Sequence, residues 1–182
     1  MRQVVRICGL AMVVCLVTKP VVTKAQAAPA APVASGPAAE VQRSYAGAKK
    51  NILKSADEMP AENYQYKPEP DIRTYARVLT HIIEAQFGSC GTANGVKDIA
   101  KPPAETAAKA TIVAALNASF EECDKAMAAL TDANALEMVT AGQRKRSRIG
   151  LMWGTVAHDQ EQYATLALYL RLKGLTPPSS EK

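Results

Sequence analysis

The stretch LMWGTVAHDQEQYATLALYLRLKGLTPP, residues 151–178, constrains the fold most strongly because it predicts one long helix with a defined end. Gly174 occupies the position just after the last turn, where helices often finish with a glycine in the left-handed conformation. The two prolines at 177 and 178 then prevent the helix from continuing. We therefore expect a single helix that stops close to residue 173.

One face of this predicted helix carries a histidine and a glutamine on a mostly apolar stripe. His158 and Gln162 are four residues apart, so they lie one turn apart on the same face. One helix can offer two ligands to a single metal ion in this way, although two histidines would be a stronger signal. The stripe consists of Leu151, Thr155, His158, Gln162, Leu166 and Tyr169.

Three further stretches show helical periodicity, and no stretch shows the alternating pattern of a half-buried strand. The first predicted helix begins at Glu40 and ends at Pro60. The second is expected near residues 75–94 and the third near 108–130, while residues 131–150 are expected to form a long link. Four amphipathic helices without strands predict an all-α four-helix bundle.

The amino-terminal segment has the pattern of a secretory signal peptide. Arg2 and Arg6 precede an apolar run of about eleven residues at 7–17, and residues 25–27 (Ala-Gln-Ala) fit a cleavage site. The apolar run is too short for a transmembrane helix. We therefore expect a periplasmic or secreted protein with no stable membrane span after cleavage. An uncleaved membrane anchor is the alternative.

These boundaries divide the chain into a signal peptide at 1–27, a flexible linker rich in alanine and proline at 28–39, and a bundle domain at 40–178. The chain has 22 basic and 17 acidic residues, and the leader holds four of the basic ones and no acid. The mature chain therefore has 18 basic and 17 acidic residues, a net charge near +1. A nearly neutral chain gives no support to nucleic-acid binding, and we expect no nucleic-acid partner.

Two of the four cysteines belong to the leader, which leaves Cys90 and Cys123 as an even pair in a chain expected to be exported. Each lies about fifteen residues into its predicted helix, so the two are level only if those helices run parallel. A parallel pair needs a crossover of roughly 30 Å, and the residues at 95–107 can span roughly 40 Å when extended. A disulfide and an up-down-down-up helix order therefore support each other. Two buried, unpaired thiols are the alternative.

Two other features have more than one interpretation. His81 lies at the border of the apolar face of the second predicted helix, where a histidine serves either as a hydrogen-bonded structural residue or as a metal ligand. The basic run from Arg144 to Arg148 is either a solvated surface or a site that gathers an anionic ligand.

The segments MPAENYQYKPEPDIRTYARVLTHIIEAQ (59–86) and GLMWGTVAHDQEQYATLALYLRLKGLTPPSS (150–180) strongly resemble the DinB-like (DinB/YfiT) superfamily. The chain is most similar to exported bacterial members of unknown function, and the resemblance covers about residues 40–180, nearly the whole mature chain. It implies a four-helix bundle in up-down-down-up order, the order that the cysteine pair also favours.

The resemblance also implies one divalent metal ion, often zinc or nickel, held by three histidines. His81 matches the ligand on the second helix and His158 the first of two on the fourth helix, whereas Gln162 stands where the family has the second. An amide oxygen is a weaker ligand for these metals than imidazole. We therefore expect His81, His158 and Gln162 to form a degenerate site with low metal occupancy.

Three functions follow from these observations. The first is a metal-dependent enzyme, similar to a hydrolase or to the thiol transferases of the family, with Asp159 or Glu161 behind the ligands, although each is more simply a solvent-exposed charge. The second is a non-catalytic ligand-binding or structural bundle of the cell envelope that has lost metal binding. The third is an anion-binding module that uses the basic run. We expect a metal-binding protein with an unidentified small-molecule ligand, and a homodimer is compatible with the resemblance.

Overall fold

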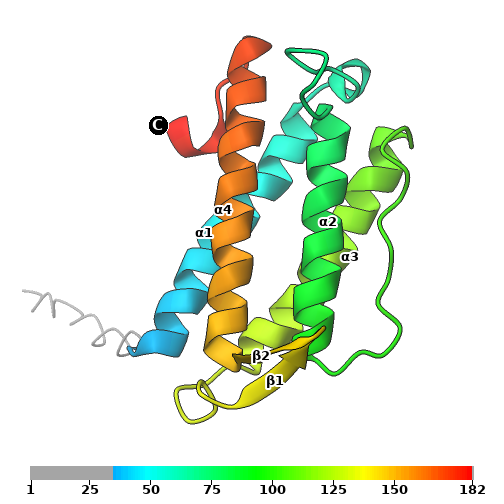
Figure 1. Ribbon diagram of the computed structural model, residues 1–182. Helices are drawn as coiled ribbons and strands as arrows, with labels where there is room; N and C mark the ends of the chain where they lie inside the picture. The colour runs from blue at the N-terminus through cyan, green and yellow to red at the C-terminus, as the bar shows by residue number, and fades with distance from the viewer. Residues whose placement is uncertain (1–34, 182) are drawn as a thin grey trace, which may run out of the picture. The chain divides into compact units, whose positions relative to one another are not determined.

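The computed structural model describes residues 35–181, and these residues form four long α-helices and one small β-hairpin (Figure 1). The all-α bundle predicted from the sequence is therefore confirmed. The predicted leader and most of the predicted linker lie outside the described residues. The elements are α1 (Pro37–Glu58), α2 (Tyr75–Ala93), α3 (Lys109–Ala128), β1 (Met138–Ala141), β2 (Arg144–Ser147) and α4 (Arg148–Leu172), with short 3-10 turns at Ala61–Asn63 and Pro178–Ser180.

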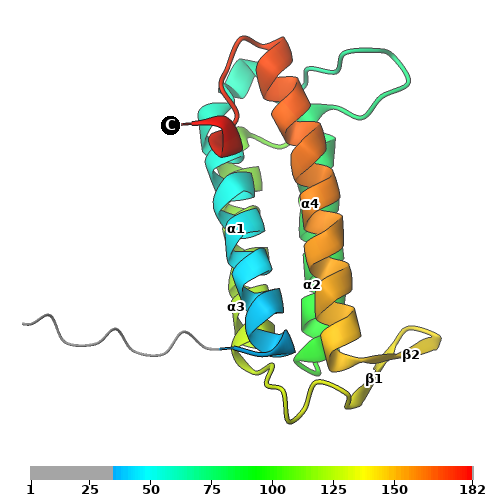
Figure 2. The ribbon, with the colours of Figure 1, turned by 90° about the vertical axis from the view of Figure 1, so that its left-hand side faces the viewer.

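Contacts between the helices give their directions. Gln86 and Cys90 of α2 meet Ser119 and Cys123 of α3, so these two helices run parallel. The segment between them returns along the length of the bundle (Figure 1). Helix α4 runs antiparallel to α2 and beside α1 (Figures 1 and 2). The four helices therefore run up, down, down and up.

Each helix buries the apolar stripe that its sequence predicts, and the four stripes meet in one core. Burying a large apolar side chain contributes roughly 1.5–3 kcal/mol, so this shared core is the main source of stability. Large core side chains with almost no exposed surface include Ile52, Tyr75, Leu79, Ile82, Ile112, Leu116, Phe120, Met152 and Tyr169.

Helix α1 begins at Pro37, three residues before the predicted start at Glu40. Proline suits the first turn of a helix because its missing N–H would have no partner within the helix. Asp132, far along the chain, accepts a hydrogen bond from the backbone N–H of Ala38 at 2.8 Å. Gly36 has φ 111°, and a Cβ at this position would collide with Asp132. The helix start is thus fixed by a tertiary contact that the local sequence does not reveal.

The structure contradicts the prediction that residues 131–150 form only a link, because this segment contains a β-hairpin. Strand β1 pairs antiparallel with β2, from Met138 opposite Ser147 to Ala141 opposite Arg144. Gly142 has φ 61°, as a glycine at the first position of a two-residue hairpin loop requires. The strands were missed because both are short and mostly exposed, so they carry no apolar alternation.

The hairpin leads directly into α4, which therefore starts at Arg148 rather than at the predicted Leu151. Ser147 caps the helix, since its hydroxyl oxygen accepts a hydrogen bond from the backbone N–H of Gly150 at 3.2 Å. The backbone N–H of Arg148 donates to the carbonyl of Glu137 at 2.8 Å, which ties the base of the hairpin to the start of the helix.

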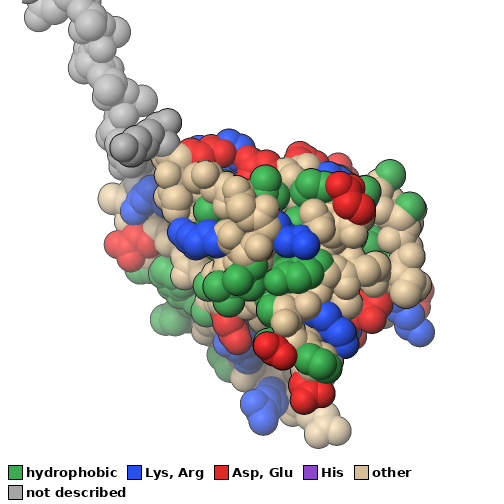
Figure 3. All heavy atoms as spheres, turned by 90° about the horizontal axis from the view of Figure 1, so that it is seen from above, with side chains coloured by type: hydrophobic (Ala, Val, Ile, Leu, Met, Phe, Trp, Pro, Cys, Tyr) green, Lys and Arg blue, Asp and Glu red, His purple; other side chains and the backbone are tan. Residues whose placement is uncertain are grey.

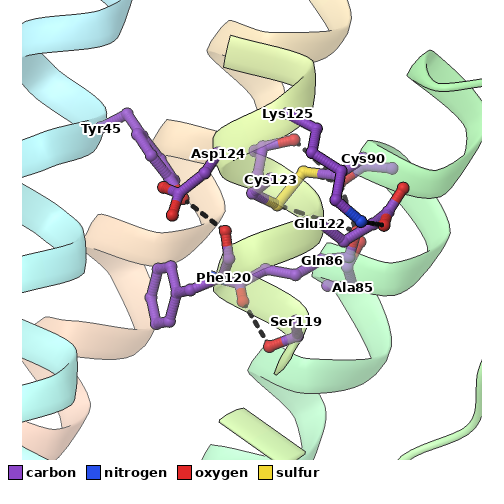
Figure 4. Close-up of a disulfide and its surroundings, with 12 residues drawn as sticks. Tyr45, Ala85, Gln86, Cys90, Ser119, Phe120, Glu122, Cys123, Asp124 and Lys125 are labelled. Atoms are coloured by element: carbon purple, nitrogen blue, oxygen red, sulfur yellow. Dashed lines mark hydrogen bonds and ion pairs between the residues drawn. A yellow bond between two sulfur atoms is a disulfide. The ribbon is translucent and has the colours of Figure 1, made fainter. Parts of the chain in front are cut away.

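A disulfide joins Cys90 of α2 to Cys123 of α3, with Cα atoms 4.9 Å apart, as the sequence predicted (Figure 4). Close to it, the hydroxyl of Tyr45 in α1 donates to Asp124 of α3 at 2.8 Å. In the chain-entropy description, a disulfide that closes a loop of this length stabilises a protein by about 3–4 kcal/mol. The disulfide therefore fastens two parallel helices that no short turn connects.

No helix among residues 35–181 is long and apolar enough to cross a membrane.

Figure 3 views the molecule from above, toward the end where α1 and α2 are connected. Acidic and basic side chains are interspersed on this face around an apolar patch. Charge of one sign is therefore not concentrated at this end of the bundle.

Candidate functional site

Two histidines that are distant in sequence meet between α2 and α4. The Nε2 atoms of His81 and His158 lie 3.1 Å apart, and their ring planes are inclined by 71°. Both side chains are partly buried. Two nitrogens bound to one tetrahedral zinc ion at about 2.0–2.1 Å are separated by roughly 3.3 Å. The observed separation therefore fits a shared ion, and it also fits a single N–H···N hydrogen bond.

The surroundings of His81 lower the pKa of its imidazole and so favour the neutral form. Partial burial lowers the pKa of His81, and Arg73, His158 and Arg77 lower it further, while Glu84 opposes them. A carboxylate oxygen of Glu84 lies 3.9 Å from His81 Nδ1 and 3.6 Å from the guanidinium of Arg77. A neutral imidazole has a lone pair free for a metal ion, so the lowered pKa favours ligation.

Gln162, the third predicted ligand, lies one turn after His158 and is 7% exposed. Its amide makes no hydrogen bond within residues 35–181, including to either histidine. Over the same residues, no group of three or more histidine, cysteine, aspartate or glutamate side chains is arranged to hold a metal ion. The structure thus brings His81 and His158 together and leaves the Gln162 amide unpaired nearby.

A fully buried carboxyl group stands behind His158. Asp159 Oδ2 accepts a hydrogen bond from Gln86 Nε2 at 3.0 Å, and Gln86 Oε1 accepts one from the Ser119 hydroxyl at 2.7 Å. Asp159 Oδ1 lies 3.9 Å from His158 Nδ1, too far for a hydrogen bond, and both atoms are buried without a hydrogen-bond partner. Burial raises the pKa of Asp159, against the influence of His158 and Gln86. A chain of hydrogen bonds therefore runs from Ser119 of α3 through Gln86 of α2 and ends at Asp159, next to His158.

From the sequence, Asp159 and Glu161 were both interpreted as surface charges, and the structure distinguishes them. Glu161 is exposed, whereas Asp159 has no exposed surface, so the expectation was wrong for Asp159. Its position three residues after Val156 and seven before Leu166 places it on a stripe that is buried throughout. That spacing was the available signal. A carboxyl group in this place can orient a histidine that binds a metal through its other nitrogen.

A pocket of about 140 Å³ opens beside His158, between α2 and α4. At its wall the Thr155 hydroxyl donates to Ser89 Oγ at 2.9 Å, and the Ser89 hydroxyl donates to the carbonyl of Ala85 at 2.8 Å. Arg146 of β2 also lines the pocket. The histidine pair is therefore next to a space that can receive a small molecule.

Comparison with known proteins identifies a family whose sequence pattern this chain matches. A sequence model described as the DinB superfamily matches residues 45–166, a segment that contains His81, His158 and Gln162. No match was found among curated proteins.

Two solved structures share the fold. A DinB-like protein from Bacillus subtilis has a TM-score of 0.62 and 14% identity, covering 75% of this chain and 93% of its own. A DinB-like protein from Bacillus cereus ATCC 10987 has a TM-score of 0.62 and 16% identity, covering 76% of this chain and 93% of its own. At these identities the similarity shows the fold and carries no information about ligands.

Proposed function

The chain belongs to the DinB superfamily, and on that premise we propose that it binds a divalent metal ion, zinc or nickel, through His81 and His158. Gln162 is the third and weakest ligand in this proposal. The observation that carries it is the 3.1 Å separation of the two Nε2 atoms, which come from helices far apart in the chain. Imidazole nitrogens are well suited to both metals.

The unpaired atoms around the pair also fit a metal ion. His158 Nδ1 and Asp159 Oδ1 are buried and lack partners within the described residues. When the Nε2 lone pair of a neutral histidine serves as a ligand, the ring proton resides on Nδ1. That proton then faces Asp159, and a carboxylate in this position fixes the ring orientation. In this proposal the two unpaired atoms are a donor and an acceptor that face each other, 3.9 Å apart.

A bound zinc or nickel ion lowers the pKa of a coordinated water or thiol and so supplies the chemistry of a hydrolase or a thiol transferase. The residues of the chain have separate roles in this proposal. His81 and His158 hold the ion, Asp159 orients His158, and the pocket beside His158 receives the small-molecule substrate. No residue of the site is assigned as a general base.

The metal content of the mature chain, residues 28–182, tests this proposal directly. The protein is purified without chelators or a histidine tag, incubated with zinc or nickel, desalted and analysed by mass spectrometry of the metals. We expect bound metal in the wild type and its loss in His81→Ala and in His158→Ala. A wild type that retains no metal after this treatment contradicts the proposal.

The role of Gln162 is tested by gain of affinity. Gln162→His should raise zinc affinity by roughly two orders of magnitude, because imidazole replaces an amide as the third ligand. Gln160→His is the matched control, since Gln160 is exposed on the same helix. Equal affinities for the two variants, measured by competition with a zinc-sensitive dye, would show that Gln162 does not face the ion.

A second candidate is a non-catalytic bundle that binds its ligand without metal. The observation in its favour is that residues 35–181 contain no group of three histidine, cysteine or acidic side chains arranged for a metal. In this case an N–H···N hydrogen bond joins His81 and His158. The two candidates separate in the metal-content measurement, because the second predicts that the wild type retains no zinc or nickel.

We also propose that the protein is exported. The leader-like pattern of residues 1–27 and the Cys90–Cys123 disulfide support this, because disulfides persist mainly in oxidising compartments. Mass spectrometry of the protein from fractionated bacterial cells should find a mature form that starts at Ala28 in the periplasmic or secreted fraction. A full-length form confined to the cytoplasm or the membrane would contradict export.

A further inference from the structure

Arg146 reaches from β2 across the first turns of α4. Its Nη2 atom donates a hydrogen bond to the carbonyl of Gly150 at 2.7 Å. A Cβ placed on Gly154 would lie 2.9 Å from Nη2 and 3.0 Å from Nη1. The guanidinium therefore lies against bare helix backbone, at two glycines one turn apart. This position brings it to the pocket beside His158.

The charge of Arg146 has no carboxylate partner among residues 35–181, unlike the charge of its neighbour. Arg148 pairs with Glu137 at 3.5 Å. A guanidinium has five N–H donors, and the Gly150 carbonyl occupies one of them. Guanidinium groups bind carboxylates through two parallel hydrogen bonds. An arginine held over a pocket without such a partner is therefore suited to bind an anion.

The size and walls of the pocket restrict the anion. Its volume of about 140 Å³ is close to that of an engineered cavity of about 150 Å³ that binds benzene. Ala85 and Leu151 provide apolar wall. Two wall hydroxyls, those of Ser89 and Thr155, already bond to each other. A compact organic acid fits these conditions, whereas a nucleotide or a polyphosphate is too large and too highly charged for one arginine.

We propose that this pocket binds the carboxylate of a small organic acid, with Arg146 as the recognition residue. Because His158 lines the same pocket, the other end of the bound acid faces His158. This assignment deepens the proposed function by naming a substrate class. It rests on the metal site only for the second anchor of the ligand, because the contact with Arg146 does not require metal.

Titration with benzoate tests the assignment, with benzamide as the neutral analogue of the same shape. Binding is followed on the mature chain by amide chemical shifts in two-dimensional NMR spectra. Benzoate should shift the amide resonances of Ser89, Gly154 and Thr155, and benzamide should leave them in place. Equal responses to the two compounds, or no response to either, would overturn the assignment. A response to inorganic phosphate without one to benzoate would contradict the carboxylate class.

Substitutions then attribute binding to the guanidinium. Arg146→Gln should weaken benzoate binding at least about tenfold, because the charged fork is lost. Arg144→Gln removes the same charge from an exposed position on the same strand, outside the pocket lining, and should leave affinity unchanged. Wild-type affinity in Arg146→Gln would overturn the proposal even if benzoate binds.

Gly154→Ala separates recognition from folding. The added methyl occupies the place of the guanidinium end of Arg146, which is flexible and can move away without disturbing the helix. Alanine also favours the helix over glycine. We expect an undiminished melting temperature together with weaker benzoate binding. Unchanged benzoate affinity in this variant would show that Arg146 does not bind benzoate from its observed position against Gly150 and Gly154 of α4.

Each titration is run on metal-free and on zinc-loaded protein so that the two proposals can fail separately. Arg146-dependent benzoate binding in a protein that takes up no zinc would refute the metal site and keep the carboxylate site. Stoichiometric zinc with no benzoate response in either form would refute the carboxylate site and keep the metal site. Benzoate binding in the zinc form alone, lost in Arg146→Gln, supports both.

Discussion

Helix α2 packs against α3 on one side and against α4 on the other, and the two interfaces differ in how fully their polar atoms are paired. Toward α3, the Cys90–Cys123 disulfide is covalent, and the side-chain amide of Asn94 donates to two oxygens of Glu122. We call this contact the α2–α3 seam. Toward α4, the α2–α4 seam contains the histidine pair, and buried atoms of His158 and Asp159 lack partners there.

One side of α2 therefore stabilises the fold, and the other side carries the candidate ligand site. Folded proteins pair nearly all of their buried polar atoms, so unpaired ones gathered in one place mark where another group belongs. Within residues 35–181, no buried side-chain nitrogen or oxygen of the α2–α3 seam lacks a hydrogen-bond partner. Among the described residues, the α2–α4 seam has a buried unpaired nitrogen on His158, a buried unpaired oxygen on Asp159 and a pocket. Stability and binding should therefore respond to different substitutions.

The largest expected effect comes from opening the α2–α3 seam. Replacing Cys90 and Cys123 together by serine should lower the free energy of unfolding by about 3–4 kcal/mol, since the disulfide closes a loop over 33 residues of sequence. Urea unfolding measures this loss, and the reduced wild type is the matched control. Zinc affinity of the folded variant should be unchanged. A large loss of zinc affinity without a loss of stability would contradict the assignment of stability to the α2–α3 seam and of binding to the α2–α4 seam.

Removing the carboxyl group of Asp159 tests the α2–α4 seam at its buried end. Asp159→Ala should lower the free energy of unfolding by about 1–3 kcal/mol, because the Gln86 amide loses its acceptor. Asp159→Asn keeps an acceptor for Gln86 and buries a neutral group, so its stability should equal or exceed that of the wild type.

The two substitutions at Asp159 should nevertheless affect metal binding alike. An asparagine lacks the charge that orients His158, so zinc affinity should fall roughly 10–100-fold in Asp159→Asn as well. A dye-competition titration measures this change. An Asp159→Asn protein with wild-type zinc affinity would show that Asp159 has only a packing role.

The smallest expected effect concerns the single hydroxyl contact across the α2–α4 seam. Thr155→Val should lower the free energy of unfolding by about 1 kcal/mol, because Ser89 loses its donor from α4. Thr165→Val is the control, since the Thr165 hydroxyl contacts only the Glu161 carbonyl of its own helix. Equal effects in chemical denaturation would show that this hydroxyl pair does not fasten the seam.

The α2–α3 seam was predictable from the sequence, whereas the α2–α4 seam was predictable only in part. Apolar stripes with helical spacing predict four helices, and an even pair of cysteines in a chain expected to be exported predicts the disulfide. His81 became a site residue through family resemblance, because spacing alone relates only residues on one helix. Nothing local to His81 indicates that His158 will lie against it.

The position of Arg146 at the pocket could not be predicted either, and the physical reason is different. In sequence, Arg146 belongs to a basic run that is equally consistent with a solvated surface. Its position depends on the turn at Gly142, on the register of two short strands, and on the bare backbone at Gly150 and Gly154. Each of these is a modest signal, and only the folded chain combines them.

The hairpin also has a consequence for how such a protein can diversify. Helices α2 and α4 carry the histidines, but the arginine arrives on a ribbon that joins the bundle at Glu137 and Arg148. Insertions at the Gly142 turn, or exchanges along β2, alter what stands over the pocket without touching the core. The ribbon is therefore a module on which selection can act independently, so that one inherited scaffold can acquire new ligand preferences at little risk to its folding.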